Sequence, residues 1–182
     1  MKAVLLTEDE HRELAKRVNG GEVTLSSARS TARQFFTQVA LSDILEVTER
    51  SLLAQKTVVI GLLCLSFILL GACLVLLMMQ FGWAAIMAAP LAGIFWTVIA
   101  GFTTELGSLL LSSLLFLISI VVSYFLPQAF FLPTLVFVTS IYAYRLAHVL
   151  AHYFFINLVR DSYLAFDMLF DHLEITDHTS RA

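Results

Sequence analysis

Two long uncharged stretches dominate the hydrophobic pattern of the chain. Residues 57–104 contain no Asp, Glu, Lys or Arg over 48 positions, and residues 106–144 contain none over 39. One transmembrane helix needs about 20 apolar residues, so each stretch is long enough for two. Turn-forming residues interrupt both: Gln80 and Gly82 in the first, Pro127 in the second. The pattern predicts four transmembrane helices, at roughly 57–79, 83–102, 106–126 and 129–150.

The region before the first span predicts two short helices. Thr7 and Glu10 form a capping box, and Asn19-Gly20-Gly21 ends the helix that they begin. A second helix is expected from about Ser26, with an apolar stripe made of Leu25, Ala28, Ala32, Phe35, Phe36 and Val39. Such a helix either lies on the inner leaflet of a membrane or packs on the protein's own helices or a partner. The sequence leaves both alternatives open.

The last helix is expected to continue beyond its span into an acidic amphipathic segment. Its polar face carries Asp167, Asp171, Glu174 and His178. This spacing is typical of a solvated helix face, although the same side chains could also chelate a divalent cation. Its apolar face consists of Phe166, Leu169, Phe170 and Leu173. Because the tail from residue 157 has a net charge of −3, an anionic leaflet should not hold it. We therefore expect the apolar face to dock on protein.

Composition and charge agree with a membrane protein. Hydrophobic residues make up 59% of the 182 residues and charged residues only 14%, whereas soluble domains are about a quarter charged. Eight of the eleven Lys and Arg precede the first span, which places the N-terminus in the cytoplasm by the positive-inside rule. Four spans return the C-terminus to the same side, and the organisation favours a bacterial inner membrane. The two cysteines, Cys64 and Cys73, are read as apolar filling.

The predicted fold is thus all-α and polytopic. It consists of four transmembrane helices in two tight hairpins, with amphipathic cytoplasmic helices at both ends. Three regions follow: a cytoplasmic helical region over 1–56, a transmembrane domain over 57–150, and an acidic amphipathic helix and tail over 151–182.

Small residues in the second predicted span form two ladders at a spacing of four, which allows close helix packing. The ladders are Ala85, Ala89 and Gly93, and beside them Ala84, Ala88 and Ala92. The third predicted span carries a polar stripe, here called the serine seam, which comprises Glu105, Ser108, Ser112, Ser119 and Ser123. The seam either faces water and a solute or only forms hydrogen bonds between helices, and the second interpretation is favoured.

The stretch "RLAHVLAHYF" places Arg145, His148 and His152 on one helix face. Two histidines on one face could suggest haem or zinc, but no other span contains a histidine and Glu105 is the nearest further ligand. We interpret the stretch as a membrane exit, where Arg145 reaches the headgroups and Glu105 meets it. Bound metal, haem or another cofactor is not expected.

Function is constrained mainly by what the sequence lacks. It contains no phosphate-binding glycine loop, HExxH, CxxC or GxSxG, and spans one to three contain no ionisable interior residue. The first hypothesis is a non-enzymatic integral membrane subunit of a larger inner-membrane assembly, such as a secretion, conjugation or envelope machine. The second is a homo-oligomeric channel lined by the serine seam, and the third is a membrane-shaping hairpin protein. Expected partners are the lipid bilayer and other membrane subunits or copies of the chain, and not nucleic acid.

Overall fold

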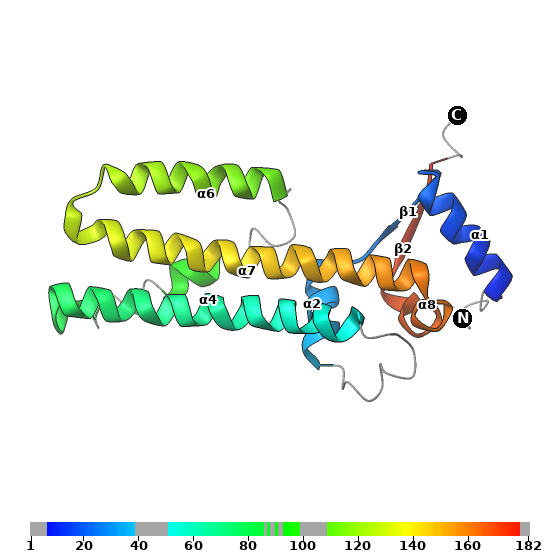
Figure 1. Ribbon diagram of the computed structural model, residues 1–182, viewed down its shortest axis with the longest axis horizontal. Helices are drawn as coiled ribbons and strands as arrows, with labels where there is room; N and C mark the ends of the chain where they lie inside the picture. Colours follow the sequence, from blue (N-terminus) through cyan, green and yellow to red (C-terminus); the bar gives the residue numbers. More distant parts are fainter. Residues whose placement is uncertain are drawn as a thin grey trace. The chain divides into compact units, whose positions relative to one another are not determined.

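The structure, a computed structural model, describes residues 7–38, 51–85, 87, 90, 93–98 and 109–178 (Figure 1). It is mostly helical, as predicted, with one small two-stranded ribbon. The chain divides into two compact units. The terminal unit combines Met1–Lys56 with Leu150–Ala182, and the apolar unit is Thr57–Val149. The two end regions therefore fold into one unit, although they were predicted as separate regions.

Three helices build the described part of the apolar unit: α4 (Ser51–Phe81), α6 (Leu109–Tyr124) and α7 (Gln128–Asp161). Both α4 and α7 also contribute their remaining residues to the terminal unit. Among the described residues, α4 and α7 are the two helices long and apolar enough to cross a membrane, judged by length and composition. The second predicted span is described only in part, with residues 93–98 helical. The count of four spans therefore stays a prediction.

Both predicted turns are confirmed. Helix α4 ends at Phe81 because Gly82 adopts a left-handed conformation (φ 60°), and the Gly82 N–H donates to the carbonyl of Met78 at 2.8 Å. Pro127 separates α6 from α7, and its carbonyl accepts the Phe130 N–H at 2.8 Å. A proline just before a helix leaves no unsatisfied amide, which explains why α7 can begin at the next residue.

Helices α4 and α7 pack antiparallel. Cys73 Sγ donates to the carbonyl of Pro133 at 3.3 Å, and the rings of Phe81 and Phe130 stack with their centroids 5.0 Å apart. Phe81 follows Cys73 along α4, whereas Phe130 precedes Pro133 along α7. The two helices therefore run in opposite directions. Helix α6 packs beside α7 through Tyr142 of α7, whose ring stacks on Phe116 of α6 at 4.4 Å.

The terminal unit contains both ends of the chain. From the N-terminal side come α1 (Glu8–Asn19), β1 (Val23–Ser26) and α2 (Arg29–Gln38). From the C-terminal side come α8 (Tyr163–Leu169), a 3-10 turn (Phe170–His172) and β2 (Glu174–Asp177). Strands β1 and β2 pair antiparallel, with Val23 opposite Asp177 and Ser26 opposite Glu174. This ribbon was not predicted.

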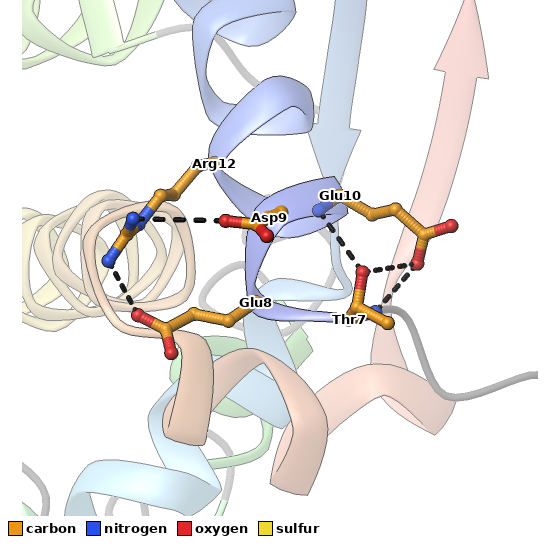
Figure 2. Close-up of polar contacts among 5 residues, drawn as sticks. All are labelled: Thr7, Glu8, Asp9, Glu10 and Arg12. Carbon is orange, nitrogen blue, oxygen red and sulfur yellow. Dashed lines mark hydrogen bonds and ion pairs between the residues drawn. The ribbon is translucent and has the colours of Figure 1, made fainter.

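The predicted capping box of α1 is confirmed (Figure 2). The Thr7 N–H donates to the Glu10 carboxylate at 2.6 Å, and Thr7 Oγ1 accepts the Glu10 N–H at 3.4 Å. The bond from the Thr7 N–H, and after it one from the Thr7 hydroxyl at 2.9 Å, favour the charged carboxylate and lower the pKa of Glu10. Figure 2 also shows Arg12 pairing with Glu8 and Asp9 on the exposed side of the helix.

An ion-pair network joins α1 to the ribbon. The Arg17 guanidinium lies 2.7 Å from a carboxylate oxygen of Asp177 and 3.4 Å from one of Glu22. The hydrogen bond that Arg17 donates to Asp177 is the main cause that raises the pKa of Arg17. Next to it, Thr24 Oγ1 and His178 Nε2 are 2.8 Å apart. The last described residues are therefore held by polar contacts as well as by the strand pairing.

Two helix predictions in the terminal unit are wrong at their ends. Helix α2 begins at Arg29, not near Ser26, because Leu25 belongs to β1. The C-terminal amphipathic helix does not continue to residue 178. Helix α7 ends at Asp161, and Ser162 in extended backbone caps α8 by accepting the Ala165 N–H. The segment after the 3-10 turn is a strand because β1 satisfies its backbone groups.

Candidate functional site

A buried polar cluster joins α4, the helical segment 93–98 and α7 inside the apolar unit. Ser66 Oγ donates to the carbonyl of Ser140 at 2.9 Å, and Ser140 Oγ donates to the carbonyl of Ser66 at 2.8 Å. Trp96 Nε1 donates to Ser140 Oγ at 3.0 Å. Both serines are 0% exposed and Trp96 is 6% exposed. We call these three residues the serine cluster.

The serine cluster holds the two long helices at close range. Two hydroxyls that each reach the backbone carbonyl of the facing helix require the helix axes to approach closely, as small residues allow. On α7 the neighbouring turns are also small and buried, since Ala143 is 6% and Ala147 0% exposed. The spacing of Ser140, Ala143 and Ala147 keeps all three on one face. Sequence reasoning missed this face, although its spacing of three and four was a readable signal.

Aromatic rings extend from the cluster along α7. The Tyr144 ring lies 4.9 Å from the Trp96 ring and 4.5 Å from the His148 ring, between centroids. His148 Nδ1 donates to the carbonyl of Tyr144 at 2.9 Å. Phe67 of α4 covers the Trp96 ring at 5.6 Å. The stack is a packing arrangement: within the described ranges, no group of three or more His, Cys, Asp or Glu side chains is placed to hold a metal ion.

The residues of the predicted membrane exit are mostly covered by the chain itself. Arg145 is 9% exposed and His148 is 3% exposed. His152 is half-buried. The assignment of this stretch as a membrane exit stays a prediction. Glu105, the expected partner of Arg145, lies outside the described residues.

The predicted small-residue ladders are seen only in part. Ala85 is buried and Ala84 is exposed. Among the described residues, no atom would lie within 4 Å of a Cβ added at Gly93. Ala88, Ala89 and Ala92 lie outside the described residues.

Two members of the serine seam have described side chains. Ser123 is 0% exposed, and its hydroxyl donates to the carbonyl of Ser119 at 2.7 Å within α6. Ser119 is half-buried. Of Ser112 only the helical backbone is described, and Glu105 and Ser108 lie outside the described residues. The adjacent Ser113, which was not predicted, bonds another helix, since its hydroxyl lies 3.0 Å from the Tyr142 hydroxyl of α7.

The predicted docking residues are partly used within the chain. Phe166 is 2% exposed, with its ring 5.0 Å from the His11 ring of α1 and 5.4 Å from that of Phe170. His11 is itself buried and donates through Nε2 to the carbonyl of Val159 at 3.0 Å. Leu169, Phe170 and Leu173 are half-buried. Docking on a partner stays a prediction for those three residues.

The apolar stripe of α2 packs on the chain's own helices. Phe36 is 0% exposed, with its ring 6.3 Å from that of Phe154. Phe35 meets the Phe155 ring edge-on at 5.6 Å. Of the two alternatives for this helix, packing on protein therefore agrees with the structure.

No protein-family model, no curated protein and no solved structure matches this chain.

Proposed function

We propose that the chain is a non-enzymatic integral membrane subunit of a larger inner-membrane assembly. The observation that supports it most is the combination of exposed apolar helices with a folded unit made of both chain ends. On α4, Ile68 is 67% exposed, Val75 55% and Met79 79%. On α6, Leu117 and Val121 are each 59% exposed. Lipid or neighbouring subunits remove such side chains from water, which stabilises them by about 25 cal/mol per Å² of apolar surface.

The terminal unit supplies the surface for docking in this proposal. Its fold joins segments about 150 positions apart in sequence, through the pairing of β1 with β2. Helix α8 is held from inside by Phe166, while Leu164 on the same helix is 55% exposed. We propose that α8 and the half-buried residues after it, Phe170 and Leu173, contact a companion subunit on the cytoplasmic side.

Native mass spectrometry of the tagged full-length protein, extracted gently from its own membrane, tests the proposal. The wild type should carry companion subunits at a fixed ratio. Leu164→Asp should lose them without lower thermal stability, because Leu164 is exposed, whereas Asp167→Asn on the exposed side of the same helix should keep them. A wild-type spectrum that contains only single chains or only copies of this chain would contradict the proposal.

The channel hypothesis receives less support from the described part of the serine seam. Ser123 is closed to water, and its hydroxyl already has an acceptor in its own helix. A solute flux abolished by Ser119→Leu, with assembly intact, would reverse this order. The membrane-shaping hypothesis predicts that the purified protein deforms liposomes, and liposomes that stay round would argue against it.

A further inference from the structure

Five large aromatic residues gather at the turn end of the apolar unit. Trp83 is 82% exposed, Phe125 80%, Tyr124 77%, Phe130 43% and Phe81 40%. Phe81 and Trp83 lie at the end of α4 and in the turn after it, and the other three lie at the end of α6, in the next turn and at the start of α7. The two turns lie at the same end of the unit in Figure 1. The stacked rings of Phe81 and Phe130 hold the two turns together. We call these five residues the aromatic collar.

We infer that the aromatic collar lies in the headgroup and glycerol layer of a phospholipid bilayer and sets the depth of α4 and α7. The inference rests on the proposed membrane function. It further specifies at which residues α4 and α7 enter and leave the hydrocarbon of the bilayer. Trp and Tyr combine an apolar ring with one polar group, and they are enriched at the boundary between hydrocarbon and water.

The chemistry around the collar favours lipid over water. Neither turn carries a charge, since Asp, Glu, Lys and Arg are absent from residues 57–104 and 106–144. The neighbouring polar side chains, Gln80 and Gln128, are neutral and exposed. If the turns stood in water, five aromatic rings would be hydrated, which is unfavourable. No ionised group nearby would offset that free-energy cost. The collar also continues the exposed apolar surface of α4 and α6, which is the surface assigned to lipid.

The depth set by the collar explains the burial of Arg145 near the middle of α7. A hydrocarbon core of about 30 Å is crossed by about 20 helical residues. Counted from Gln128, the first residue of α7, that distance ends near His148. Arg145 then lies just inside the hydrocarbon boundary, where its guanidinium needs protein around it, and it is only 9% exposed.

The same count on α4 accounts for its single basic residue. From Phe81 back toward the start of the helix, about 20 residues reach the neighbourhood of Gly61. Helix α4 begins at Ser51, so about ten residues, Lys56 among them, lie beyond the hydrocarbon. When the collar lies at the near boundary, Arg145 of α7 thus lies close to the far boundary and Lys56 of α4 lies beyond it.

Tryptophan fluorescence of the full-length protein tests this placement. The chain has two tryptophans, exposed Trp83 and buried Trp96, so the difference between wild type and Trp83→Phe reports on Trp83. The vesicles are phosphatidylcholine with lipids brominated either next to the glycerol or near the chain end. We expect glycerol-proximal bromine to quench the Trp83 signal several-fold more than chain-end bromine. In the Trp83→Phe background, Tyr124→Trp should restore the same profile.

Three results would overturn the inference. They are stronger quenching by chain-end bromine, quenching by aqueous iodide alone, and no quenching by either, which would mean that protein covers the collar. A further variant separates this failure from failure of the proposed function. Ile68→Trp in the Trp83→Phe background places an exposed ring near the middle of α4. If chain-end bromine quenches it while Trp83 fails, only the collar is refuted; if aqueous iodide alone quenches it, the membrane subunit is refuted too.

Discussion

The serine cluster leads to an asymmetric prediction for two residues that look equivalent in sequence. Ser66→Ala removes one hydroxyl that donates to a helix carbonyl. Such interhelical bonds contribute on average about 0.6 kcal/mol in membranes. Ser140→Ala removes the reciprocal bond and also the acceptor of the Trp96 indole N–H. A buried donor left without a partner costs about 1–3 kcal/mol. We therefore expect Ser140→Ala to destabilise the protein by about 2 kcal/mol more than Ser66→Ala does.

A double-mutant cycle isolates the cause of that difference. In a Trp96→Phe background the orphan indole N–H no longer exists, so Ser140→Ala should cost only about 0.6 kcal/mol there. The free energy of unfolding is measured by reversible denaturation in mixed micelles, followed by circular dichroism. Thr139→Ala on the same helix is the matched control. Its hydroxyl donates to the carbonyl of Leu135 within α7, so its removal should have nearly no effect.

Two outcomes would refute the reasoning about the serine cluster. The first is an equal loss of stability in Ser66→Ala and Ser140→Ala. The second is a Ser140→Ala effect that stays unchanged when Trp96 is replaced by Phe. Either result would mean that the indole N–H is not satisfied by Ser140.

Three further predictions follow from packing, capping and charge. Ala147→Leu should destabilise the apolar unit by about 1–3 kcal/mol in micelle denaturation, because Ala147 is fully buried. Gly71→Leu, at a position with open space beside it, should not destabilise the unit. Equal effects of the two substitutions would contradict close packing at Ala147. Thr7→Ala should speed amide exchange throughout α1, since it removes the capping box. Glu10→Ala removes the carboxylate of the same box. The lowered pKa of Glu10 means that its contribution is complete above its ordinary value of 4.5 and is lost as pH falls below it, so Glu10→Ala and wild type should converge in acid; a difference that persists there would contradict the carboxylate's role. Arg17→Ala should raise amide exchange in the ribbon by a few-fold at low salt and less at high salt, and an effect independent of salt would argue against the ion pairs.

The elements predicted correctly have local signals. The capping box of α1 lies within four residues, and the turns at Gly82 and Pro127 depend on the conformational preferences of single residues. The long apolar helices α4 and α7 follow from uncharged stretches that admit little else. In each case the residues that determine the structure lie next to one another along the chain.

The elements that were missed depend on distant partners. Strand β1 alternates between buried and exposed residues over only four positions, and β2 is exposed throughout, so neither gives a strong local signal. The two strands form because each satisfies the other's backbone groups. The acidic segment around Glu174 has helical spacing, but pairing with Ser26 decides its structure. Ser66 and Ser140 are 74 positions apart, and nothing in a single apolar helix distinguishes a serine that bonds across helices from one that bonds its own.

Labelling of Cys64, one of the two natural cysteines in α4, tests most directly whether this helix crosses a bilayer. Cys64 lies on the exposed surface of the chain and Cys73 is buried, so only Cys64 has a surface that lipid could cover. With the protein in intact vesicles, a membrane-impermeant maleimide should leave Cys64 unlabelled until detergent dissolves the bilayer, while Lys56→Cys near the start of the same helix should react on the cytoplasmic side. Prompt labelling of Cys64 in intact vesicles would contradict the account.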